Sequence, residues 1–82
     1  MRDSNVDTIQ SGEYLHYKGK KYEVFCLSTH SETEERLVVY RPLYGEAYDN
    51  NDRFGDVWVR PLTMFLENVN INGKVIPRFK KL

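Results

Sequence analysis

Four side chains with acid–base or hydrogen-bonding capacity stand together in the segment His30-Ser31-Glu32-Thr33. A nucleophilic serine needs a base within about 2.6–3.2 Å and a third group that orients this base. Neighbouring residues of an extended strand point to opposite faces, so His30 is poorly placed to activate Ser31, whereas Glu32 shares the face of His30. We therefore expect a polar loop or a ligand-binding strand end here. A small enzyme or accessory subunit that uses His30 and Glu32 as an acid–base pair is the alternative.

Arginines beside prolines form a second group with chemical potential. They occur in the pairs Arg41-Pro42, Arg60-Pro61 and Pro77-Arg78, each at the end of an expected strand. Arginine makes forked hydrogen bonds to carboxylate or phosphate and also stacks on aromatic rings. On a strand, Arg60 shares its face with Trp58. Converging arginines would form an anion pocket, and surface pairing with Glu23, Glu46 or Glu67 is the alternative.

The possible metal ligands are few. His16, His30 and Cys26 match no zinc spacing, and the Asp/Asn-rich segment 49–56 lacks the glycine and glutamate that an EF-hand needs at its sixth and twelfth positions. The sequence therefore predicts no metal and no cofactor. The single cysteine excludes an intrachain disulfide, and its apolar neighbours in 24–27 predict a buried, inert thiol.

Charge and hydropathy limit the class of protein further. The 82 residues carry 12 Lys+Arg and 12 Asp+Glu, whereas general nucleic-acid coat proteins carry a basic excess that neutralises phosphates. A local basic bias does follow Glu67, where Lys74, Arg78, Lys80 and Lys81 occur without an acidic side chain. No apolar run approaches the about 18 residues of a membrane span, and no signal-peptide pattern opens the chain. We therefore expect a cytoplasmic protein.

Short aromatic and β-branched runs between turn residues predict the elements that position these side chains. The expected strands are 14–17, 22–27, 37–40, 57–60, 69–71 and 74–76. Asn72-Gly73 is a strong hairpin signal and places Val69 opposite Ile76. The segment 61–67 begins with proline and has an apolar face at i, i+3 and i+4, so it predicts one or two helical turns.

Five or six short strands and one short helical turn predict a mostly β domain, closed into a small SH3-like β-barrel that leaves no exposed edge. Residues 1–11 are expected to form a flexible arm, and residues 12–82 a single SH3-like barrel domain. The long connection 43–56 is expected to be functional or mobile. The expected core residues are Leu37, Val39, Val57, Val59, Phe65 and Val69.

Several motifs together resemble DUF1653, a small bacterial family of unknown function. The motifs are GEYLHYKGKKYEV at 12–24, HSET at 30–33, VVY at 38–40, YG at 44–45, WVRP at 58–61, MF at 64–65 and PRF at 77–79. The resemblance covers about residues 12–79 and implies the barrel fold but no activity. It marks as signature positions His16, Tyr17, His30, Ser31, Glu32, Thr33, Tyr40, Trp58, Arg60 and Arg78.

Three functions remain open at this point. The first is a non-catalytic binding module for an anionic ligand, which would be a nucleotide, a nucleic-acid segment or a peptide. The second is the small enzyme described above, and the third is a structural domain that docks onto a larger protein. The first hypothesis predicts that one shared surface carries His16, His30, Glu32, Trp58, Arg60 and Arg78.

Overall fold

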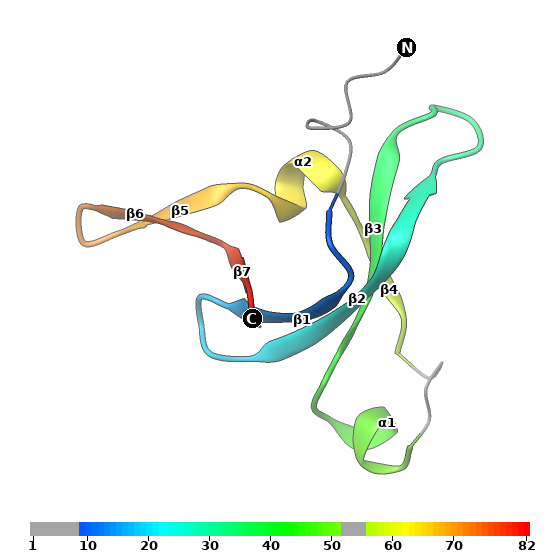
Figure 1. Cartoon of the computed structure of the whole chain (residues 1–82), viewed down its shortest axis with the longest axis horizontal. Coiled ribbons are helices and arrows are strands. Elements are labelled where there is room, and N and C mark those ends of the chain that lie inside the picture. The colour runs from blue at the N-terminus through cyan, green and yellow to red at the C-terminus, as the bar shows by residue number, and fades with distance from the viewer. Residues whose placement is uncertain (1–8, 52–55) are drawn as a thin grey trace.

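The computed structural model describes residues 9–51 and 56–82, which form seven strands and two one-turn helices (Figure 1). The elements are β1 (Gly12–His16), β2 (Lys21–Thr29), β3 (Arg36–Pro42), α1 (Glu46–Asp49), β4 (Trp58–Pro61), α2 (Leu62–Phe65), β5 (Asn68–Ile71), β6 (Lys74–Pro77) and β7 (Phe79–Lys81). The mostly β fold predicted from the sequence is confirmed. The helical turn that follows Pro61 is confirmed as α2.

Five strands form an antiparallel sheet in the order β4-β3-β2-β1-β7, and β5 pairs only with β6. Strands β4 and β7 are the two edges of this sheet, so the sheet is open and the expected closed barrel is wrong. The hairpin β5–β6 projects away from the sheet and does not bridge its edges (Figure 1). The additional strand is β7, which lies in the basic C-terminal segment and pairs with β1.

The hairpin β5–β6 has the predicted register, with Val69 opposite Ile76. The φ angles of Asn72 and Gly73 are 52° and 84°. A two-residue turn with two positive φ angles matches the right-handed twist of the strands that it joins, and Asn-Gly adopts these angles at low cost. Local sequence therefore determines this hairpin.

The core lies on one face of the five-stranded sheet, which we call the inner face. Its buried side chains are Tyr14, Tyr22, Val24, Val38 and Tyr40 from the sheet, Leu62 and Phe65 from α2, and Phe79 from β7. The rings of Phe65 and Phe79 stack with centroids 4.1 Å apart and an interplanar angle of 3°. Because large aromatic side chains bury much area each, this packing suits a small domain.

The predicted core is wrong in all but one residue. Phe65 is buried, but Val59 is 59% exposed and Val57 is also exposed. Leu37, Val39 and Val69 are only partly buried. Strand β3 is apolar on both faces, so alternation alone does not show which face is covered. Helix α2 and strand β7 pack over the face that carries Val38 and Tyr40. Leu37 and Val39 lie on the opposite side of the sheet, which we call the outer face.

The expectation of a buried thiol is also wrong, because Cys26 is exposed. The register between β2 and β3 shifts between Val24 and Cys26. This β-bulge adds one residue to β2, so that Cys26 lies opposite Val39 on the outer face. The bulge brings Leu27 opposite Val38, and Leu27 packs against the core.

Two expected loop segments are only partly described. Of the arm at 1–11, residues 1–8 lie outside the described residues, while Ile9 packs against the core. The hydroxyl of Tyr14 donates a hydrogen bond to the carbonyl of Gln10 at 2.7 Å. The connection 43–56 contains α1, and its residues 52–55 lie outside the described residues.

Candidate functional site

A group of polar and aromatic side chains extends the inner face beyond the buried core. Trp58 lies opposite Tyr40, and Arg60 lies opposite Val38, so both point to the inner face, and Arg60 shares a face with Trp58 as expected. His16 follows Tyr14 by two positions on β1 and reaches the same face. With Tyr17 and Arg78, these residues form what we call the cation–aromatic cluster, which consists of His16, Tyr17, Trp58, Arg60 and Arg78.

Arg60 provides the cluster with a cation that rests on aromatic rings. Its Nε donates to the hydroxyl of Tyr40 at 3.4 Å, and its guanidinium carbon lies 5.6 Å from the centre of the Phe79 ring. Among the described residues, no carboxylate forms an ion pair with Arg60. The carboxylates of the described residues therefore leave the terminal nitrogens of Arg60 unpaired, and a guanidinium in that state can make a forked hydrogen bond to an anion.

The other two arginines that neighbour prolines have carboxylate partners. Arg41 on the outer face pairs with Glu23 at 3.0 Å, in a partly buried bridge. Arg78 pairs with the exposed Glu67 at 3.4 Å, and its buried Nε has no hydrogen-bond partner among the described residues. A solvent-exposed pair of this length contributes little to stability, so Arg78 remains able to face an anion.

His16 lies at the centre of the cluster. Its ring packs on Tyr17 with centroids 4.6 Å apart and on Phe79 at 4.9 Å. Its Nδ1 accepts a hydrogen bond from the backbone N–H of Lys18 at 3.1 Å, so the neutral ring carries its proton on Nε2. Burial lowers the pKa of His16, and the positive charges of Arg60, Arg78 and Lys18 lower it further. A bound anion would oppose these charges.

Aromatic rings form the wall around these cations. Trp58 is 40% exposed, and its ring lies 6.0 Å from Tyr22 and 5.9 Å from Tyr40. The hydroxyls of Tyr22 and Tyr44 are hydrogen bonded at 2.8 Å, and burial together with this bond raises the pKa of Tyr22. Lys20 lies over the Tyr44 ring at 4.6 Å. Tyr22 therefore stays neutral, and a basic side chain lies at the rim.

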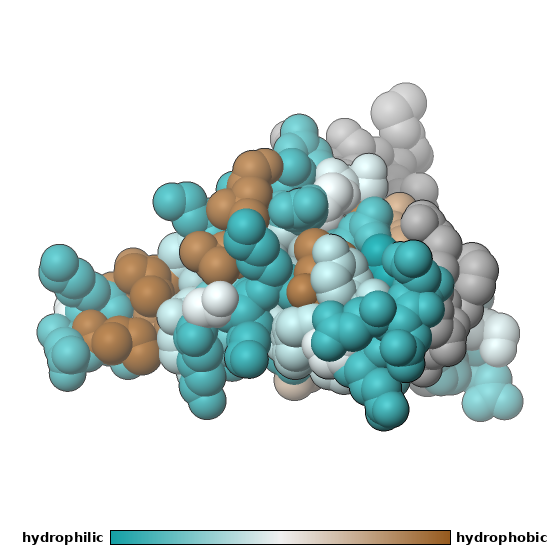
Figure 2. All heavy atoms as spheres, turned by 90° about the horizontal axis from the view of Figure 1, so that it is seen from below, coloured by the Kyte–Doolittle hydropathy of each residue, from teal (hydrophilic) through white to brown (hydrophobic). Residues whose placement is uncertain are grey.

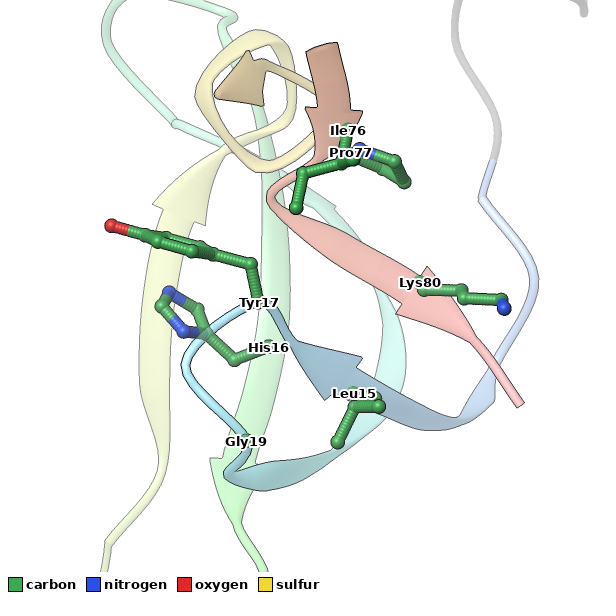
Figure 3. A pocket seen from close by; sticks show the side chains of 7 residues that line it. All are labelled: Leu15, His16, Tyr17, Gly19, Ile76, Pro77 and Lys80. Atoms are coloured by element: carbon green, nitrogen blue, oxygen red, sulfur yellow. The ribbon is translucent and has the colours of Figure 1, made fainter. Parts of the chain in front are cut away.

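A groove of about 450 Å³ adjoins the cluster, and we call it the side groove. It is lined by Leu15, His16, Tyr17, Gly19, Ile76, Pro77 and Lys80. Figure 3 shows Tyr17 and His16 on one side of the groove, Lys80 on the other and Pro77 above. His16 and Tyr17 belong to both the groove and the cluster, so the two meet at these residues.

The segment His30–Thr33 follows the end of β2 that is opposite to the end nearest His16. Strand β2 has nine residues, which at about 3.3 Å per residue corresponds to roughly 25–30 Å. Nδ1 of His30 accepts hydrogen bonds from the backbone N–H groups of Glu32 at 3.1 Å and Thr33 at 3.3 Å. The hydroxyl of Thr33 accepts one from Glu35 N–H. These bonds close the β2–β3 turn.

The signature residues are thus divided between two regions. The cluster collects His16, Tyr17, Trp58, Arg60 and Arg78, with Tyr40 buried beneath Arg60. The turn contains His30, Ser31, Glu32 and Thr33. Among the described contacts, none joins His30 or Glu32 to the four other residues, so one surface that carries all six stays a prediction.

Sequence reasoning missed Phe79 and the side-groove residues Leu15 and Ile76. Phe79 is buried beneath both His16 and Arg60, yet it stands in the basic segment that follows Glu67. The alternation Phe79-Lys80-Lys81 was the only local signal for β7, and three residues are too few to establish a period.

Other site types have no support in the part of the chain that the structure describes. Within residues 9–51 and 56–82, no three His, Cys, Asp or Glu side chains are grouped as a metal site would require. The described helices, each of one turn, are too short to cross a membrane.

The fold and the site define a small antiparallel β domain with an open sheet and a cation–aromatic cluster on its inner face. The family model DUF1653, described as a protein of unknown function, matches residues 12–81, and the chain belongs to this family. A crystal structure of a DUF1653 protein from Bordetella bronchiseptica is similar, with a TM-score of 0.75 and 32% sequence identity. The match covers 90% of this chain and 87% of that chain. Among curated proteins, no relative matches the chain.

Proposed function

We propose that this domain is a non-catalytic binding module whose cation–aromatic cluster holds an anionic ligand. The observation that carries the proposal is the state of Arg60, a guanidinium that rests on Phe79 and Tyr40 and has no carboxylate partner among the described residues. Arg78 and His16 add positive or proton-donating groups beside it. Such a group suits carboxylate or phosphate, which accept forked hydrogen bonds from arginine.

The surroundings of the histidines favour binding over catalysis. Nδ1 of His16 is occupied by the Lys18 N–H, and in the described part of the chain no carboxylate orients the ring. Nδ1 of His30 is occupied by two backbone N–H groups. The cluster is also open, since Trp58 is well exposed, and an open site does little to exclude water from a reacting group.

Titration of the ¹⁵N-labelled domain with sodium pyrophosphate tests the proposal. We expect saturable shifts of the Trp58 indole N–H and of the Arg60 and His16 side-chain signals. Arg60→Ala should weaken binding about tenfold or more, because hydrogen bonds to charged groups contribute about 1.5–3 kcal/mol. Added salt should weaken binding as well, because the charges are near the surface.

Arg41→Ala is the matched control, because it removes an arginine from the outer face of the same sheet. It should leave pyrophosphate affinity unchanged. Equal affinities of the Arg60→Ala and Arg41→Ala variants, with both variants folded by their amide dispersion, would contradict the proposal. That result would favour the docking-domain hypothesis.

A further inference from the structure

The side groove has walls that suit an aliphatic group. Leu15, Ile76 and Pro77 provide apolar side chains, and Gly19 lines it with no side chain at all. The φ angle of Gly19 is +100°, which keeps this turn position open to glycine in preference to larger residues. A volume of about 450 Å³ falls in the range typical of ligand sites. An apolar group placed there would contact these apolar side chains.

Positive charge surrounds the side groove. Lys80 lines it directly, and none of its lining residues is acidic. Lys18, Arg60 and Arg78 are close enough to His16, on the opposite wall, to lower its pKa. An occupant of the groove should therefore carry negative charge next to its apolar group.

Charge complementarity argues against a second copy of this chain as the occupant. The natural candidate would be the projecting hairpin β5–β6, whose strands pack mainly on each other and expose Ile71 and Val75. Figure 2 shows hydrophobic surface on the hairpin at the left of the molecule. The hairpin carries Lys74 beside its turn, and a lysine would meet the positive charge around Lys80. Like charges brought together in this way oppose association.

The groove also suits a nucleobase poorly. The polar edges of a base lose hydrogen bonds to water and need partners, which aliphatic walls do not supply. Proteins that bind single-stranded nucleic acid present aromatic rings for successive bases. In the described part of the groove, Tyr17 and His16 are the only rings, and they already pack on each other.

We propose that the side groove takes the apolar side chain of an acidic, extended peptide, with the carboxylates of that peptide against the cation–aromatic cluster. The inference rests on the proposed function and names its ligand class. His16 and Tyr17 form the shared wall between the apolar and the anionic part of the site. The peptide therefore needs an apolar residue flanked by Asp or Glu.

Two blocked peptides of equal charge, Ac-EELEE-NH2 and Ac-EESEE-NH2, test this inference by NMR titration. The leucine peptide should bind about tenfold more tightly or better, since burial of one leucine side chain contributes about 1.5–3 kcal/mol. It should shift the amides of Leu15, Gly19 and Ile76. Ac-KKLKK-NH2 and the oligonucleotide dT6 should produce no saturable shifts in the groove.

Ile76→Ser should reduce the preference for the leucine peptide to near unity. Val75→Ser is the matched control, because Val75 is 65% exposed and does not line the groove, and it should keep the preference. Equal affinity of the two acidic peptides, or groove shifts with dT6 or the lysine peptide, would overturn the inference. Binding of pyrophosphate through Arg60 without binding of either peptide would overturn it too, while leaving the proposed function intact. Failure of pyrophosphate together with the peptides would overturn the proposed function as well.

Discussion

The inner and outer faces of strand β3 are made of similar residues but have different surroundings. On the inner face, Val38 and Tyr40 are buried under α2 and β7. On the outer face, Val39 lies between Cys26 and Val59, both exposed. The faces therefore differ because of the elements that pack on them, and not because of hydropathy along the strand.

The arginines on the two faces also differ in their surroundings. Arg41 on the outer face is neutralised by its cross-strand neighbour Glu23. Arg60 on the inner face is opposite Val38 and rests on aromatic rings. Arg60 has no carboxylate directly opposite it and forms no ion pair with a described residue.

The largest expected effect tests the inner face at its centre. Phe65 is 1% exposed and stacks on Phe79, so Phe65→Ala should lower the free energy of unfolding by about 3–5 kcal/mol. Met64 is the preceding residue of α2 and is 46% exposed, so Met64→Ala should change the free energy of unfolding by no more than about 0.5 kcal/mol. Urea unfolding of both variants measures the difference, and similar urea midpoints would refute the assigned core.

A comparison of one valine on each face should give a smaller change in the free energy of unfolding. Val38 is fully buried, and Val38→Ala should lower the free energy of unfolding by about 2 kcal/mol, from two carbons at about 0.8 kcal/mol each and the cavity that they leave. Val59→Ala on the outer face should change it by at most about 0.5 kcal/mol. A larger loss from Val59→Ala in urea unfolding would show that the outer face is covered.

The smallest effect concerns the protonation of His16. Its pKa is lowered below the ordinary value of 6.5, so the unfolded chain binds a proton more readily than the folded domain does. The corresponding stability is present above pH 6.5 and is lost as the pH falls through 6.5 toward the folded pKa. His16→Asn should reduce the fall of Tm between about pH 7.5 and about pH 5.5, the range that brackets this loss.

An NMR titration of the His16 ring checks this directly. Its midpoint should lie below 6.5 and should rise in the Arg60→Ala variant, which removes one of the charges that lower the pKa. A midpoint at or above 6.5 in the unmodified domain would contradict the described surroundings of His16.

Much of the candidate site was foreseeable in residue type but not in location. Alternation on β4 correctly placed Arg60 and Trp58 on one face. Their residue types led us to include His30 and Glu32, which lie in the turn after β2, where Nδ1 of His30 accepts local backbone hydrogen bonds. Residue types alone do not show how far apart two polar side chains lie in the folded domain.

The sequence by itself determined the features that depend on neighbouring residues. Asn72-Gly73 set the turn and register of β5–β6, and Pro61 preceded the helical turn of α2. The six predicted strands lie within a few residues of the observed bounds of β1 to β6, and β7 was not predicted. In each of these cases, local backbone preferences are enough to select the conformation.

Only the tertiary structure decided which side of the sheet is the core and which arginine has no carboxylate partner among the described residues. Those outcomes depend on Phe79, which reaches the inner face because β7 pairs with β1 from the opposite end of the chain. They depend also on the bulge before Cys26, which moves one side chain to the outer face. The alternation of residues along one strand does not predict its contacts with distant segments. In an apolar strand with two similar faces, those contacts decide which face is buried.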